Sequence, residues 1–247
     1  MPNRKSHSTF TENDPMTYPF PMWEIPTVPI AGSNDRFPVR HIYCVGRNYA
    51  EHAKEMGGDA SKDPPFFFTK PADAIVAVVP PAVGSIRYPL VTRNFHHEIE
   101  LVVAIGKRGV QLAPERANDI VFGYATGLDM TRRDLQNEMR EKKRPWDIGK
   151  SFAQAAPIAP IHPIAQTGLL TRGAIWLDVN GARRQQGDLA DMIWDVPHTL
   201  AFLSQLYELL PGDLVFTGTP AGVGAVVAGD TLDGHIEGLS PLAIKIE

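Results

Sequence analysis

The segment from Glu98 to Ile105 constrains the fold of this 247-residue chain more than any other. It reads Glu-Ile-Glu-Leu-Val-Val-Ala-Ile, and such a density of aliphatic residues predicts a strand, which we expect to run from His97 to Gly106. Successive side chains of a strand point to opposite faces, so Glu98 and Glu100 share one face. Two neighbouring carboxylates repel each other. The strand therefore predicts either a solvated sheet face or a bound cation, and spacing alone leaves these interpretations equal.

A third carboxylate stands at the end of the next predicted strand. Asp129 follows the apolar run 120–128 and precedes a predicted helix, for which Thr131 is the expected N-cap and Lys142 the approximate end. A junction between a strand and a helix exposes a side chain on a rigid frame. Asp129 therefore favours a metal site, although a capping or turn aspartate is the alternative.

The chemistry of these candidates limits the choice of metal. Ligands that are all carboxylate oxygens favour Mg²⁺, Mn²⁺ or Ca²⁺ over zinc. His96 and His97 come directly before the carboxylates, but adjacent side chains on a strand face opposite ways. We interpret both histidines as supporting or surface residues, not as ligands.

The remaining patterns predict many strands and few helices. Asn180-Gly181 indicates a type I′ hairpin turn, and Pro197 suits the first turn of a helix that would end at Leu210. Asn48 is a candidate cap for a short helix. Further strands are expected at 40–45, 66–68, 74–79, 175–179, 183–186, 214–217 and 242–246. The expected fold is mixed α/β and β-dominated, with a flexible N-terminal tail at residues 1–20 and one domain at residues 21–247.

Composition excludes several classes of function. The net charge is −4 and the longest basic run is Lys142-Lys143-Arg144, so we expect no nucleic-acid partner. No stretch approaches the roughly 18 apolar residues of a membrane span, and the polar N-terminus does not resemble a secretory signal. The single cysteine, Cys44, lies in an apolar run and is expected in the core. These features predict a cytoplasmic protein.

A candidate acid–base pair lies on the predicted helix after Asn48. His52 and Glu55 are three residues apart and are neighbours on a helix surface. A histidine beside a carboxylate can act as a general base. A minor contact on an exposed helix is the more common role of such a pair, so the residues alone do not favour catalysis.

Several segments together resemble the fumarylacetoacetate hydrolase family, in particular its acylpyruvase branch. They occur in family order at Val45–His52, Phe68–Pro71, Asn94–Leu101, Gly127–Thr131, Lys150–Phe152 and Thr217–Gly224. The resemblance implies mixed sheets rolled into a barrel-like core, a few short helices and a homodimer. It implies that Mg²⁺ or Mn²⁺ is bound by Glu98, Glu100 and Asp129.

The resemblance also implies roles for the other candidates. His52 and Glu55 become a water-activating dyad on a mobile lid, and Lys150 becomes a catalytic and substrate-binding residue. Substrate-binding positions are matched by Arg133, Gln136 and Thr219. The implied reaction is hydrolysis of a carbon–carbon bond in a 2,4-dioxo acid, with fumarylpyruvate preferred and fumarate and pyruvate as products. Oxaloacetate decarboxylation and isomerisation or hydration of 2-oxo dienoic acids are the alternatives at the same site.

Overall fold

The computed structural model describes residues 17–55 and 64–247, apart from the side chains of Ala53 and Glu55. Strands dominate this part of the chain, and only α3 (Arg133–Glu141) and α6 (Val196–Leu206) exceed two helical turns. The shorter α-helices are α1 (Ala50–Glu55), α2 (Pro114–Ala117), α4 (Asp147–Lys150) and α5 (Ile164–Thr167). Single 3₁₀ turns lie at Ala72–Ala74, Asn118–Ile120 and Leu189–Asp191.

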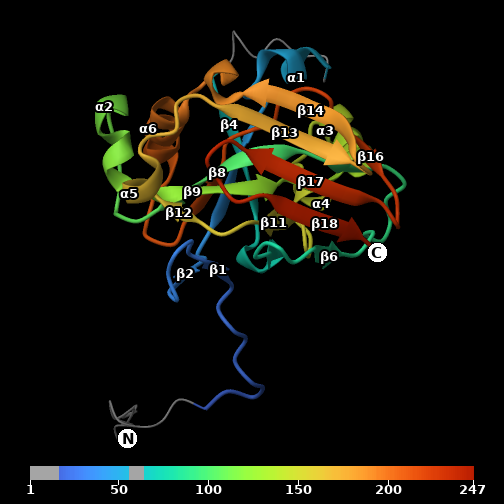
Figure 1. Ribbon diagram of the computed structural model, residues 1–247, viewed down its shortest axis with the longest axis horizontal. Coiled ribbons are helices and arrows are strands. Elements are labelled where there is room, and N and C mark those ends of the chain that lie inside the picture. The colour runs from blue at the N-terminus through green and yellow to red at the C-terminus, as the bar shows by residue number, and fades with distance from the viewer. Residues whose placement is uncertain (1–16, 56–63) are drawn as a thin grey trace, which may run out of the picture.

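An eight-stranded mixed sheet forms the centre of the molecule (Figure 1). Its strands follow the order β4 (Phe66–Lys70), β3 (Ile42–Gly46), β15 (Leu214–Phe216), β8 (Ile99–Ile105), β9 (Val121–Leu128), β11 (Ala156–Ile158) and β5 (Ile75–Ala77), while β12 (His162–Pro163) pairs with β9. Every residue of β8 is buried. Since β8 is covered on both faces, its run of aliphatic residues fits a central strand.

A five-stranded sheet covers one face of the central sheet. Its order is β14 (Ala182–Asp188), β13 (Ala174–Val179), β17 (Thr231–Ile236), β18 (Leu242–Ile246) and β6 (Gly84–Ile86). β13 packs against β8 and β17 against β9. In Figure 1 the strands β13, β17 and β18 lie in front of the central sheet. The core between the sheets is aliphatic, and it includes the buried thiol of Cys44, as predicted.

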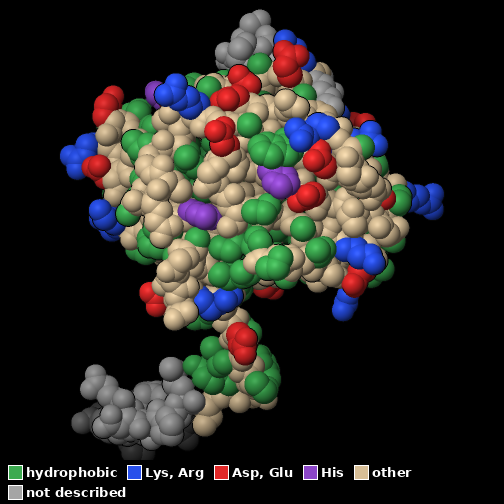
Figure 2. Space-filling view, viewed as in Figure 1, with side chains coloured by type: hydrophobic (Ala, Val, Ile, Leu, Met, Phe, Trp, Pro, Cys, Tyr) green, Lys and Arg blue, Asp and Glu red, His purple; other side chains and the backbone are tan. Residues whose placement is uncertain are grey.

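Two small sheets complete the fold. β10 (Thr131–Arg132), β7 (Phe95–His97) and β16 (Gly224–Val226) form one, and β1 (Thr27–Pro29) and β2 (Arg36–Pro38) form the other. Before β1 the chain leads away from the body, and large apolar side chains are exposed along it (Figure 2). The predicted tail at residues 1–20 lies mostly outside the described residues, so it stays a prediction.

The observed elements confirm the predicted class, a β-rich mixed α/β fold of curled sheets with a few short helices. The hairpin at Asn180 and Gly181 is present, and both residues have the positive φ, 52° and 76°, of a type I′ turn. In the described part of the chain, no helix has the length and apolarity needed to cross a membrane.

Several details of the elements differed from the sequence-based predictions. The strand predicted from His97 to Gly106 is β8 at Ile99–Ile105, whereas His97 ends β7, because β7 pairs with β10 and β16 while β8 pairs with β9 and β15. The helix after Pro197 ends at Leu206, since Leu209 forms a β-bridge with Gly109. Asn48 was predicted to cap a short helix. Its side chain instead joins distant segments, because it forms hydrogen bonds with the backbone of Trp194 and donates to the carbonyl oxygen of Thr217.

Candidate metal centre and active site

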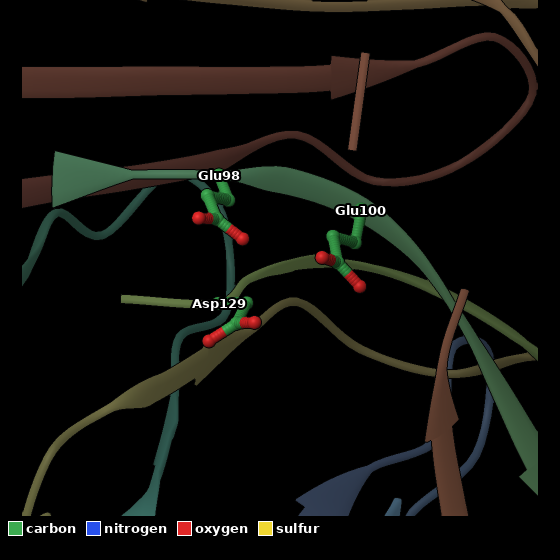
Figure 3. A group of neighbouring side chains, drawn as sticks. All are labelled: Glu98, Glu100 and Asp129. Atoms are coloured by element: carbon green, nitrogen blue, oxygen red, sulfur yellow. The ribbon is translucent and has the colours of Figure 1, made fainter. Parts of the chain in front are cut away.

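Three buried carboxylates converge at one end of the central strands. Glu98 lies between β7 and β8, Glu100 lies in β8, and Asp129 follows β9. The pairing of β8 with β9 holds them together, because the Asp129 N–H donates to the Glu98 carbonyl oxygen at 2.9 Å. One carboxylate oxygen from each lies within 4.8 Å of the others. Figure 3 shows the three side chains close together.

Three cationic side chains partly balance this charge. Lys150 Nζ donates to Glu98 Oε2 at 2.9 Å and to Asp129 Oδ2 at 2.7 Å. Lys70 Nζ lies 2.8 Å from Asp129 Oδ1, and the guanidinium of Arg133 contacts Glu98 Oε1. All of these side chains are buried. Glu98 and Asp129 are therefore held as ion pairs, the usual requirement for buried charge.

Glu100 has a different environment from the other two carboxylates. The N–H of Gly218 donates to Glu100 Oε2 at 2.8 Å. Burial, followed by the charges of Asp129 and Glu98, raises the pKa of Glu100 well above its ordinary value. Burial alone would also raise the pKa of Glu98, but Lys150 and other neighbouring cations outweigh it and lower that pKa. A further positive charge beside Glu100 would therefore stabilise its ionised form.

The donor set fits a divalent cation. Asp129 Oδ1 is buried and accepts no hydrogen bond, although Lys70 lies at ion-pair distance. The carboxylate of Glu100, whose pKa is raised by burial and by its two acidic neighbours, is the group that a bound cation would stabilise most. Three carboxylate ligands suit a hard ion such as Mg²⁺ or Mn²⁺. Glu98, Glu100 and Asp129 thus form a divalent metal site, and its three residues are those expected from the sequence.

A single pocket brings the other predicted residues to these carboxylates. His52 of α1, Arg133 and Gln136 of α3, Lys150 of α4 and Thr219 line it together with Glu98 and Glu100. His52 is only 5% exposed, so it is not the surface residue that its helix position alone indicated. Glu55 lies in α1, but its side chain is outside the described part of the structure, so the dyad stays a prediction.

Thr131 belongs to the site and not to a helix cap, contrary to the prediction. It lies in β10, in register with His96, while Arg132 occupies the N-cap position of α3 without a side-chain hydrogen bond. The Thr131 hydroxyl accepts from Lys150 Nζ at 2.7 Å and lies 3.3 Å from Glu98 Oε1. Strand pairing with β7 turns this hydroxyl toward the carboxylates.

Both neighbouring histidines have structural partners. His97 is buried, and its Nδ1 lies 2.9 Å from Oε1 of Gln185. His96 is half-buried beside Asn94 and the guanidinium of Arg133. Neither belongs to the group of three carboxylates, and their interpretation as supporting residues stays a prediction.

Gln185 is a buried residue of the site that sequence reasoning missed. Its Nε2 donates to Thr219 Oγ1 at 2.7 Å and to the Pro220 carbonyl at 2.8 Å, and its Oε1 accepts from the N–H of Ile99. One amide thus joins the turn after β15 to the start of β8. The only sequence signal was a glutamine in the mostly polar strand β14, whose other residues are exposed or half-buried.

Lys70 and three pocket residues were also missed. Lys70 lies within a segment that matched the family, and its ammonium group also donates to the carbonyl oxygens of Met130 and Lys150. Arg47, Arg140 and Trp146 line the same pocket as the predicted residues. Arg140 continues the helical spacing of Arg133 and Gln136, which is the signal that could have found it.

The fold and the buried carboxylates define a metal-dependent enzyme. A family model described as Fumarylacetoacetate (FAA) hydrolase C-terminal matches residues 41–247. The chain therefore belongs to the fumarylacetoacetate hydrolase family.

Particular members of the family are also similar to this chain. Fumarylpyruvate hydrolase of Ralstonia sp is 44% identical over 188 residues, which cover 76% of this chain and 95% of that protein. A crystal structure of fumarylpyruvate hydrolase from Pseudomonas aeruginosa, in complex with Mn²⁺ and pyruvate, has a TM-score of 0.92 and 52% identity, covering 93% of this chain and 99% of that one. Mitochondrial oxaloacetate tautomerase FAHD1 of Rattus norvegicus is 39% identical over 208 residues, covering 84% of this chain and 92% of that protein.

Proposed function

We propose that this protein is a fumarylpyruvate hydrolase, which cleaves fumarylpyruvate with water to give fumarate and pyruvate. One observation carries the proposal: a pocket beside three buried carboxylates, in a chain 52% identical to a fumarylpyruvate hydrolase whose structure contains Mn²⁺ and pyruvate. We further propose Mg²⁺ or Mn²⁺ as the cofactor, a homodimer as the assembly and the cytoplasm as the location.

The 2-oxo acid end of the substrate would lie next to the carboxylates. Glu98, Glu100 and Asp129 would hold the cation, which supplies Lewis-acid polarisation of the substrate oxygens when bound. Thr219 Oγ1 accepts a hydrogen bond from Gln185, so its own proton can be donated to a substrate oxygen. Gln136 accepts from Arg133, which leaves its amide N–H groups as donors.

Lys150 contributes positive charge to this end of the pocket. Its ammonium group donates to Glu98, Asp129 and Thr131, which uses all three of its protons. The pKa of Lys150 is raised, because Asp129 and Glu98 outweigh the effect of burial. Lys150 therefore stays protonated, and a direct bond to the substrate requires that it release one of its present acceptors.

His52 would act as the general base, oriented by Glu55. It removes a proton from a water molecule, whose oxygen attacks the C4 carbonyl of fumarylpyruvate. The C3–C4 bond then breaks and its electron pair moves to C3, which gives fumarate and the enolate of pyruvate. Protonation at C3 completes pyruvate. Positive charge around the 2-oxo acid end stabilises the enolate as it forms.

The test is an activity assay with purified protein and Mg²⁺ or Mn²⁺. The ultraviolet absorbance of fumarylpyruvate should fall while fumarate and pyruvate appear in equal amounts. A His52→Ala variant should lose hydrolysis but keep its metal. Turnover of simple acylpyruvates without turnover of fumarylpyruvate would contradict the proposed substrate. It would still support hydrolysis of a carbon–carbon bond as the reaction class.

Oxaloacetate chemistry is the second candidate function. It is favoured by the 39% identity to a mitochondrial oxaloacetate tautomerase over 84% of this chain. Tautomerisation and decarboxylation need no attacking water, so they would survive in His52→Ala more fully than hydrolysis. Conversion of oxaloacetate by the wild-type protein, without cleavage of fumarylpyruvate, would establish this function instead.

A further inference from the structure

Three side chains of α3 point into the same pocket at helical spacing. Arg133, Gln136 and Arg140 are separated by three and four residues, which places them on one face of the helix. All three line the pocket that contains Glu98 and Glu100. Arg133 and Gln136 are buried and Arg140 is half-buried, as expected for a row that runs from the interior toward the pocket mouth.

Of the three side chains on this face of α3, Arg133 lies closest to the metal site. Arg133 contacts Glu98, so it lies at the metal site. Arg140 is seven residues further along α3, which corresponds to about 10 Å along the helix axis. Arg140 thus carries a positive charge to a part of the pocket remote from the carboxylates.

The pocket carries more positive than negative side chains. Among the described residues that line it, Arg133 and Lys150 form ion pairs with Glu98. Arg140 and Arg47 also line it, so four cationic side chains face two carboxylates, Glu98 and Glu100, even before a divalent ion binds. Such a pocket attracts a substrate with more than one anionic group.

The pocket also has an aromatic wall. Trp146 lines it and packs edge-on against Phe66, with ring centroids 5.1 Å apart. The guanidinium of Arg47 lies 5.9 Å from the centroid of the same Phe66 ring. Arg47 holds a left-handed backbone conformation, with φ of 59°, which a side chain other than glycine seldom adopts outside constrained sites. An aromatic wall beside cations suits a flat, conjugated and anionic group.

We propose that Arg140 binds the distal carboxylate of the substrate and selects long dicarboxylates over acylpyruvates with an uncharged end. This inference rests on the proposed function for the position of the 2-oxo acid end. Six carbon–carbon bonds separate the two carboxylate carbons of fumarylpyruvate, so the extended molecule spans about 7–8 Å. An arginine about 10 Å along α3 from the metal end, with a flexible side chain, can reach that carboxylate.

The same geometry distinguishes substrates by length. Three carbon–carbon bonds separate the carboxylate carbons of oxaloacetate, which span only about 4 Å. Its second carboxylate would lie near Arg133 and Gln136 and not at Arg140. Arg140 should therefore affect fumarylpyruvate strongly and oxaloacetate or acetylpyruvate little.

The test compares Arg140→Gln with the wild-type enzyme on fumarylpyruvate and acetylpyruvate. Loss of a charge-assisted hydrogen bond should raise KM for fumarylpyruvate about 10–100-fold, with a smaller effect on kcat. Acetylpyruvate kinetics should change less than about twofold. Arg140→Lys keeps the charge and should recover part of the KM. Arg144→Gln removes an exposed arginine just beyond α3 and is the matched control.

A binding measurement separates this inference from the proposed reaction. Calorimetry with His52→Ala, and with His52→Ala combined with Arg140→Gln, measures affinity for both substrates without turnover. Weaker binding of fumarylpyruvate alone in the double variant supports the inference, even if the wild-type enzyme hydrolyses neither compound. Equal losses for both substrates, no loss for either, or no preference of His52→Ala for fumarylpyruvate would overturn it.

Discussion

Replacing Glu100 with glutamine should separate the stability of the metal-free protein from its response to metal. Glu100 is 1% exposed and shares the site with two other carboxylates. Glutamine has nearly the same shape, and its side-chain oxygen can still accept the hydrogen bond from Gly218 N–H. The substitution therefore removes a charge and a metal ligand with little change in packing.

The expected magnitudes follow from the spacing of the carboxylates. The ligand oxygens lie within 4.8 Å of one another, and two unit charges at that separation repel by about 3.5 kcal/mol at an effective dielectric constant of about 20. Lys150, Lys70 and partial protonation already relieve much of this repulsion. We expect Glu100→Gln without metal to be as stable as the wild-type protein or more stable, by up to about 2 kcal/mol.

With metal present, the wild-type protein should become more stable than Glu100→Gln. At a metal concentration one hundred times its Kd, binding adds about 2.7 kcal/mol to the wild-type stability. For a domain of this size, that corresponds to a rise in Tm of about 5–10 °C. Glu100→Gln retains two of the three carboxylate ligands and should gain less than half of this rise.

The assay is thermal unfolding followed by circular dichroism, first with a chelator and then with Mn²⁺ or Mg²⁺. Glu115→Gln, an exposed residue of α2, controls for a general effect of losing one negative charge. Equal metal-induced shifts in the wild-type protein and in Glu100→Gln would refute the metal site. A loss of about 3 kcal/mol or more in the chelated variant would refute the repulsion that motivates the experiment.

Three further predictions concern other parts of the structure. Lys70→Met removes one of the two buried ammonium groups that contact Asp129 and leaves only Lys150, so it should lower the free energy of unfolding in chelator by up to about 3–5 kcal/mol, measured with urea; an unchanged value would contradict the ion pair. Gly218→Ala should cost about 1–3 kcal/mol in the same assay, because φ is +97° and the new Cβ would lie 2.7 Å from Asn48 Cβ. Deletion of residues 1–20 should leave Tm and kcat/KM within error, and a large loss of either would show that the tail is more than accessory.

Local sequence patterns predicted those features that depend on local geometry. The two-residue period of strands predicted that Glu98 and Glu100 face the same way, and their carboxylates converge although Glu98 lies just before β8. The Asn180-Gly181 pair predicted its hairpin. The ends of elements were less predictable. The helix after Pro197 ends at Leu206 because of a bridge to Gly109, 100 residues away from Leu209 in the chain.

The missed site residues are joined by contacts between distant segments. Lys70 meets Asp129 across 59 positions of sequence, and Gln185 meets Thr219 across 34. Thr131 satisfied the composition rule for a helix cap, but pairing of β10 with β7 took precedence. Such contacts depend on sheet topology, and neither the hydrophobic periodicity of the sequence nor secondary-structure propensity determines that topology. The family resemblance indicated the ligand set because members of one family share the same sheet topology.

The placement of the metal ligands in the sheet has a consequence for hydrogen exchange. Glu100 lies in β8, which is paired on both sides, and Asp129 follows β9, its direct neighbour. Backbone amides of such central strands exchange through global unfolding and not through local fraying. Metal that binds there should slow hydrogen exchange throughout the central sheet and not only at the ligands. The slowing should correspond to the whole free energy that metal binding adds to the stability of the folded protein. The cation would thus stabilise the whole folded chain in addition to its chemical role in one pocket.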